Sequence, residues 1–179
     1  MKRFALFALV ALMAAPLFAA DEPLAVGTKV PAFYVKDVTG PAAGEKLCYR
    51  CRYGNKPVVS IFAREMNANV AELVKQVDAQ VAANGDKGMA AFVVLLTEDE
   101  AAGAKSLKAT ADAQGIKKTP LTTFDGAAGP ENYKISADAD VTVMMWVGGE
   151  LKVNQAFAKD GLNGEAVKTV VSKTSAILN

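Results

Sequence analysis

The chain has 179 residues, of which 20 are Lys or Arg and 19 are Asp or Glu, so its formal net charge is +1. This balance gives no broad basic or acidic field that would recruit nucleic acid or an anionic membrane. The sequence contains no histidine, which excludes the commonest metal ligand and every Ser–His or Cys–His nucleophile arrangement.

The first 20 residues predict a secretory signal peptide. Lys2 and Arg3 precede an apolar run that ends in small residues, the usual order of charged start, apolar centre and cleavage zone. The run is shorter than the about 20 apolar residues that a membrane-spanning helix needs. We therefore expect residues 1–20 to be removed on export. Residues 21–179 then form one periplasmic or extracellular domain with no membrane contact after cleavage.

The first half of the mature chain predicts two strands and a helix. The segment 33–38 alternates as a strand, and the continuous apolar run 58–63 is typical of a buried central strand. A helix follows, with Asn67 or Asn69 as its cap and Gly85 at its end. Its apolar residues recur at helical spacing, at Val70, Leu73, Val74, Val77 and Val81.

The second half predicts further strands and helices. Strands at 90–97 and 121–125 flank a helix that begins with acids and stops at Gly115. Strand 141–147 then enters a hairpin through a turn at Gly148–Gly149. Alternating strands and helices imply parallel pairing, so we expect a central mixed sheet with helices on both faces. The tail predicts one helix whose apolar face holds Val167, Val170, Val171 and Leu178.

Four stretches of the chain match the pattern of a known superfamily. They are VGTKVPAFYVKDVTG (26–40), KPVVSIFARE (56–65), GIKKTPLTTFDG (115–126) and VTVMMWVGGELKVNQAF (141–157). Together they resemble the thioredoxin-fold superfamily in its secreted bacterial form, thioredoxin-like or peroxiredoxin-like. The resemblance implies an α/β, thioredoxin-like fold with a central mixed sheet and an N-terminal extension. It also implies a cis-proline at Pro120, where Thr119 and Pro120 would contact a bound peptide or thiol partner.

The usual active site of that superfamily lacks its cysteines here. When Phe62–Ala63 is aligned with the end of the family's first core strand, Met66 and Asn69 fall at the positions of the two active-site cysteines. A methionine forms no thiolate, and the thiolate is the nucleophile. Neither the usual thioredoxin mechanism nor peroxidase chemistry is therefore expected at this place. The adjacent Arg64–Glu65 is expected to form an exposed ion pair, with an anion site as the alternative.

The only two cysteines, Cys48 and Cys51, form a Cys-x-x-Cys motif ahead of the core strand. In an oxidising compartment such a pair is expected to form a disulfide. The neighbouring Arg50 and Arg52 favour a thiolate, which supports an active redox pair, and both are candidate contacts for a partner. A structural or partner-facing bridge is the main alternative. A Cu(I) site, with methionines as further soft ligands, is a lesser one.

We therefore expect an exported thioredoxin-like protein whose displaced Cys48–Cys51 pair takes part in thiol–disulfide exchange or redox homeostasis with a protein partner. The alternative is a non-catalytic binding module with a structural Cys48–Cys51 disulfide. Apart from the Cu(I) alternative, no cofactor, metal or nucleic acid is expected to bind. Which cysteine attacks, and the oligomeric state, stay open. A tight turn at 54–57 favours a position for the pair at the opposite end or edge of the sheet from the usual site.

Overall fold

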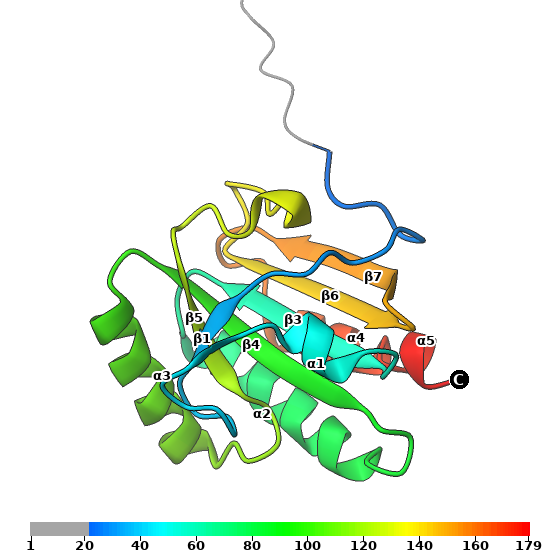
Figure 1. The fold of residues 1–179 in the computed structure, drawn as a ribbon, viewed down its shortest axis with the longest axis horizontal. Coiled ribbons are helices and arrows are strands. Elements are labelled where there is room, and N and C mark those ends of the chain that lie inside the picture. Colours follow the sequence, from blue (N-terminus) through cyan, green and yellow to red (C-terminus); the bar gives the residue numbers. More distant parts are fainter. Residues whose placement is uncertain (1–21) are drawn as a thin grey trace, which may run out of the picture.

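A mixed sheet of seven strands organises residues 22–179, the residues that this computed structural model describes (Figure 1). The predicted signal peptide lies outside the described residues. Across the sheet the strand order is β2-β1-β5-β4-β3-β6-β7. In chain order the elements are β1 (Val35–Asp37), β2 (Lys46–Leu47), α1 (Tyr49–Tyr53), β3 (Val58–Ala63), α2 (Ala68–Ala83), β4 (Ala90–Thr97), α3 (Glu100–Gln114), β5 (Leu121–Asp125), the 3-10 turn η1 (Glu131–Tyr133), β6 (Val141–Val147), β7 (Glu150–Phe157), α4 (Gly164–Ser172) and α5 (Ser175–Leu178).

The centre of the sheet is parallel and its flanks are antiparallel. β4 pairs in parallel with both β3 and β5. β6 and β7 on one side, and β1 and β2 on the other, run antiparallel to their neighbours. Parallel neighbours need long crossovers, which α2 and α3 supply, whereas the predicted turn at Gly148–Gly149 joins the antiparallel pair β6 and β7. The predicted mixed sheet is confirmed.

Most helices and strands begin and end where the local pattern predicts. β3, β4, β5 and β6 coincide with the strands predicted at 58–63, 90–97, 121–125 and 141–147. The Asn67 side chain caps α2 by accepting the N–H of Val70 at 3.0 Å, and all five residues of the predicted apolar face are buried. α3 stops at Gly115, whose φ of 66° is left-handed. Within residues 22–179, no helix is long and apolar enough to cross a membrane.

The C-terminal tail differs from the prediction of one helix. It forms α4 and α5, with a break at Thr174. The Thr174 hydroxyl donates to the carbonyl three residues earlier at 2.8 Å, so a side chain competes with the helical backbone bonds at this point. The buried residues of the tail include Val167, Val170 and Ile177, whereas Val171 and Leu178 are half-buried.

The two faces of the sheet carry unequal layers (Figure 1). α2, α3, α4 and α5 cover one face, where Val77 and Leu107 lie in the core. The second face is covered by α1, η1 and the N-terminal segment, through Tyr49, Tyr133 and Phe33. Helices lie on both faces as predicted, but the second face has only short ones. β3, β4 and β5 follow one another across the sheet in one direction, and right-handed crossovers therefore put α2 and α3 on the same face.

Candidate functional site

The Cys48–Cys51 motif folds into a helical turn that the sequence pattern did not predict. β2 ends at Leu47, Cys48 is the N-cap residue of α1, and Cys51 lies within α1. The two cysteines form a disulfide, with a Cα–Cα distance of 5.2 Å. The Cys48 Sγ also accepts the backbone N–H of Cys51 at 3.0 Å. The predicted disulfide is therefore present, inside one short turn.

The two sulfur-bearing residues differ in exposure. Cys48, which follows the edge strand β2, is 7% exposed. Cys51 is exposed, and so are Arg52 and Lys56 after it. A thiol partner can therefore approach the disulfide from the side of Cys51, which the cationic residues Arg52 and Lys56 follow in the sequence.

Tyr49 fixes the turn to the sheet. The residue is 1% exposed, and its ring stacks on Phe92 of β4 with centroids 5.3 Å apart. The Tyr49 hydroxyl donates to Asp37 Oδ2 at 2.8 Å. Burial first, and then the Asp37 carboxylate beside the hydroxyl, raise the pKa of Tyr49 above the usual tyrosine range. The middle of the Cys-x-x-Cys is therefore anchored in the core of the second face.

The buried carboxylate of Asp37 accepts hydrogen bonds from three donors. It is 1% exposed and accepts the N–H of Gly40 at 2.7 Å and that of Ala42 at 2.8 Å, besides the Tyr49 hydroxyl. A Cβ at Gly40 would lie 2.4 Å from the Tyr49 hydroxyl and 2.6 Å from the Asp37 carboxylate, so this close approach requires glycine. Asp37 thus ties the loop between β1 and β2 to the disulfide turn.

Arg50 points back into the fold. Its Nε donates to the Val30 carbonyl at 3.0 Å and its Nη1 to the Gly54 carbonyl at 3.4 Å. A Cβ at Gly149 would lie 2.1 Å from Arg50 Nη2, so the guanidinium passes directly against the β6–β7 turn. Of the two arginines predicted to contact a partner, only Arg52 is exposed. Arg50 is half-buried and holds the Val30 and Gly54 carbonyls through hydrogen bonds.

The disulfide turn lies over the N-terminal half of β3, away from the usual site, as expected. The Tyr53 hydroxyl donates to the Ala91 carbonyl at 3.2 Å, and Ala91 pairs with Val59, the second residue of β3. The C-terminal end of β3 leads instead to Asn67 and α2. The disulfide and the end of β3 are therefore two separate places on the sheet.

At the C-terminal end of β3, Arg64 does not form the expected ion pair among the described residues but donates to backbone carbonyls. Its Nε donates to the Ala139 carbonyl at 2.8 Å, its Nη2 to the Ser136 carbonyl at 3.1 Å, and its Nη1 to the Ala127 carbonyl. The irregular loop from β5 to β6 offers carbonyls without strand partners, and the guanidinium fork satisfies them. Glu65 is exposed. Arg64 is therefore a clamp on this loop.

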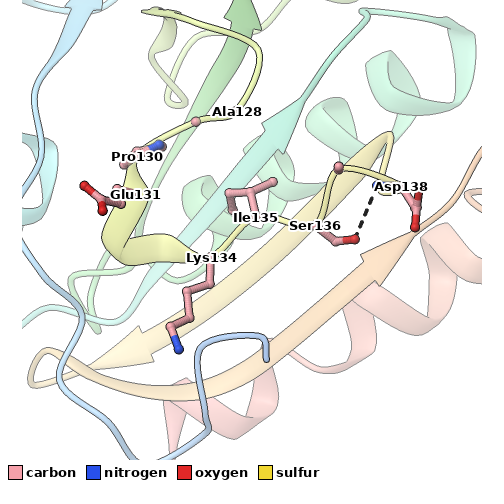
Figure 2. A pocket seen from close by; sticks show the side chains of 9 residues that line it. Ala128, Pro130, Glu131, Lys134, Ile135, Ser136 and Asp138 are labelled. Carbon is pink, nitrogen blue, oxygen red and sulfur yellow. Dashed lines mark hydrogen bonds between the residues drawn. The ribbon is translucent and has the colours of Figure 1, made fainter. Parts of the chain in front are cut away.

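The same loop lines a cavity of about 390 Å³ between residues 128 and 138 (Figure 2). Figure 2 shows that Glu131, Lys134 and Asp138 point in different directions. The backbone N–H of Asp138 donates to the Ser136 Oγ at 3.3 Å. A binding or catalytic pocket needs a few polar groups that converge on one point. We therefore assign no chemistry to this cavity.

Arg64→Ala is expected to loosen the β5–β6 loop and to lower the free energy of unfolding by about 2 kcal/mol, because three carbonyls lose a charged donor. Hydrogen exchange followed by mass spectrometry should show faster exchange in the loop and unchanged exchange in α1. Arg52→Ala, which removes an exposed arginine, is the matched control. Equal exchange of the loop in both variants would contradict the assignment of Arg64 as its clamp.

Pro120 follows a trans peptide bond, which corrects the cis-proline expected from the resemblance. Thr119 is 2% exposed, and Pro120 is also buried. The Thr119 N–H donates to Asp78 Oδ1 at 2.7 Å, and the Pro120 carbonyl accepts the Val93 N–H at 2.9 Å. The chain enters β5 directly beside β4, so the trans form, favoured by roughly 0.5–1 kcal/mol, fits without a bend. Contact of Thr119 and Pro120 with a partner stays a prediction.

The methionines near these elements serve packing. Met144 and Met145 on β6 are each 0% exposed and lie on opposite faces of the sheet. Met66 is half-buried against the core beside α2. Nothing in the placement of these thioethers within residues 22–179 supports the Cu(I) alternative.

Sequence reasoning missed Asp37 and the way in which Tyr49 is anchored to Asp37 and Phe92. For Asp37 a signal exists in the stretch DVTG, where an Asp three residues before Gly40 is typical of a side chain that accepts backbone N–H groups in a turn. For Tyr49 no such signal exists, because its burial depends on Phe92, which is far along the chain.

The sequence matches no protein-family model and no curated protein. Solved structures share its fold. A protein assigned as the thiol:disulfide interchange protein DsbE of Chlorobium tepidum has a TM-score of 0.67 and 13% identity, over 87% of this chain and 99% of that one. The thioredoxin domain of a thiol-disulfide oxidoreductase from Bacteroides vulgatus has a TM-score of 0.58 and 16% identity, over 83% and 99%. The reduced 2-Cys peroxiredoxin of Plasmodium vivax has a TM-score of 0.63 and 15% identity, over 86% and 83%. The fold is therefore thioredoxin-like, as predicted.

Proposed function

We propose that this chain is exported to the periplasm or the extracellular space and exchanges disulfides with protein thiols through Cys48 and Cys51. The observation that carries the proposal is a disulfide with one exposed cysteine on the surface of a thioredoxin-like fold. Two of the similar structures are named for thiol–disulfide chemistry, which supports the same class of reaction. The absence of histidine is no obstacle, because thiol–disulfide exchange needs only a thiolate and a disulfide.

The surroundings of the pair suit an exchange reaction. The exposed side chains of Lys46, Arg52 and Lys56 flank the turn in the chain. Nearby cations stabilise a thiolate and lower its pKa, which raises the fraction of reactive sulfur near neutral pH. Met66 and Asn69 occupy the aligned positions of the usual cysteines, so the chemistry we propose belongs to the α1 turn alone.

A second candidate function is a non-catalytic binding module in which the disulfide only braces α1. The observation that favours it is the anchoring of both residues between the cysteines. Tyr49 donates to Asp37, and Arg50 donates to the Val30 carbonyl. A turn held in this way keeps its two sulfurs together, which stabilises the oxidised form and lowers the reduction potential.

The reduction potential of the pair separates the two functions. For an exchange protein we expect a value between about −120 and −270 mV, and for a brace a value below about −300 mV. The measurement equilibrates the mature chain in glutathione or dithiothreitol buffers and counts free thiols by mass after alkylation. An exchange protein should also transfer its disulfide to a reduced model protein.

Matched variants complete this test. Cys48→Ser and Cys51→Ser should each abolish transfer of the disulfide, because a single cysteine carries none. Asn69→Ala, at the aligned position of a usual cysteine, should leave transfer unchanged. A potential below about −300 mV with no transfer by the wild-type chain would reject exchange and leave the brace.

A further inference from the structure

The two cysteines of the motif are not equivalent, and the difference lies in their surroundings. Cys48 follows β2 and is 7% exposed. Its backbone carbonyl accepts the N–H of Arg52 in α1 at 2.9 Å. Cys51 is exposed. An attacking thiolate must reach one of the two sulfurs, so access favours attack at Cys51.

The other requirement is a leaving sulfur that tolerates a negative charge. The Cys48 Sγ already accepts the N–H of Cys51 at 3.0 Å. A hydrogen bond to the charged form stabilises that form, and it becomes stronger when the acceptor is ionised. The N–H therefore offers a ready partner to a thiolate on Cys48. Solvent can likewise stabilise a thiolate on the exposed Cys51. Stabilisation of the thiolate therefore does not distinguish the two cysteines, and access decides which of them is attacked.

The neighbouring residues keep Cys48 in place during such a step. Tyr49, the next residue, is held by Asp37 and by the ring of Phe92. Arg50 is held by the Val30 carbonyl. These contacts involve no atom of the disulfide, so they persist when the disulfide opens. A thiolate on Cys48 would therefore stay beside Cys51 and be positioned to attack a mixed disulfide there.

We propose that Cys51 forms the mixed disulfide with the partner and that Cys48 is the leaving and resolving sulfur, an assignment that rests on the proposed function. A partner thiolate bonds to Cys51 Sγ, the Cys48–Cys51 bond breaks, and its electron pair leaves on Cys48 as a thiolate. A second partner thiolate then attacks the partner sulfur of the mixed disulfide and releases Cys51. The partner dithiol is oxidised by two electrons to a disulfide, and the cysteine pair is reduced. In the reverse direction, the Cys51 thiolate attacks a partner disulfide and Cys48 resolves it.

The unmodified mature chain provides the decisive test. Oxidised protein is mixed with reduced glutathione for a short time and quenched with N-ethylmaleimide, which caps whichever cysteine was released. Trypsin cleaves after Lys46 and Arg50, so the peptide 47–50 carries Cys48 alone. We expect this peptide to carry the maleimide at least about tenfold more often than glutathione, because the exposed cysteine is attacked faster. Glutathione mainly on Cys48 would overturn the assignment and leave the proposed function standing.

Single-cysteine variants give an independent readout. Cys48→Ser retains the exposed cysteine and should form a mixed disulfide with dithionitrobenzoate at least about tenfold faster than Cys51→Ser, which retains the buried cysteine. Both variants are first compared by thermal melting, so that an unfolded variant is recognised. Equal or reversed rates in folded variants would overturn the assignment. If the wild-type chain forms no glutathione adduct at all, the proposed function itself fails.

Discussion

Asp37→Ala is expected to lower the free energy of unfolding by about 4 kcal/mol, since it removes a buried charged acceptor and leaves three donors without it. The donors are the backbone N–H groups of Gly40 and Ala42 and the hydroxyl of Tyr49. Chemical denaturation followed by circular dichroism measures the change. Because Tyr49 lies between the two cysteines, the same variant should also speed reduction of the disulfide by dithiothreitol.

Two comparison variants make this expectation specific. Tyr49→Phe removes one of the three hydrogen bonds and keeps the ring on Phe92, so its cost should be about 1–2 kcal/mol. Asp86→Ala removes an exposed aspartate and should change stability by no more than about 0.5 kcal/mol. If Asp37→Ala costs no more than Asp86→Ala, Asp37 does not organise the loop and the turn as we describe.

Alkaline pH is expected to unfold the protein from about pH 10 upward, where a tyrosine in the unfolded chain begins to ionise. Burial is the main cause that raises the pKa values of Tyr49, Tyr53 and Tyr133 above the usual tyrosine range. Below pH 10 both the folded and the unfolded state keep these protons, and the stability they provide is fully present. As the pH rises further, the unfolded state loses the protons first and is stabilised by this ionisation, so the free energy of unfolding falls by up to about 1.4 kcal/mol per pH unit for each tyrosine.

Three such tyrosines should make the protein about 4 kcal/mol less stable at pH 11 than at pH 9. Denaturation curves at a series of pH values, with phenolate absorbance recorded in parallel, measure this slope. Tyr133→Phe should flatten the slope by about 1.4 kcal/mol per pH unit, although it also removes the hydrogen bond to the Pro31 carbonyl. Tyr34→Phe, at a residue that is 67% exposed, is the control and should leave the slope unchanged. A slope that is identical in all three proteins would contradict the role of buried tyrosines.

The parts of the fold that were predicted correctly have short-range causes. The run 58–63 is apolar at every position except Ser60, and β3 is buried at every position. The spacing of Val70, Val74 and Val77 places them on one face of α2 whatever lies opposite, because 3.6 residues make a turn. Asn67 caps α2 through a bond that spans only three residues. Such features need no knowledge of the rest of the chain.

Apart from the break in the C-terminal tail, which has a local cause at Thr174, the errors have long-range causes. α1 has five residues and no apolar period, and Tyr49 is held there by Asp37 and Phe92. Arg64 was expected on the surface, but the loop that it clamps lies more than 60 residues further along the chain. Pro120 was expected to be cis from a resemblance, yet it enters a parallel strand beside β4, where the trans form fits.

The order of residues was sufficient to indicate a mixed sheet and a disulfide between Cys48 and Cys51. The thioredoxin-like character of the fold came from the family resemblance, and the alignment of Met66 and Asn69 with the usual cysteines stays a prediction. The mixed sheet depends on periodicity and the disulfide on cysteine count, and both are local or chain-wide properties of the sequence. The unequal exposure of Cys48 and Cys51 required the tertiary structure. Only two residues, Tyr49 and Arg50, separate the cysteines, and no apolar period in the sequence marks either cysteine as buried. Their exposure is set by the contacts of Tyr49 and by the edge strand before Cys48, so only packing against distant strands distinguishes one sulfur from the other.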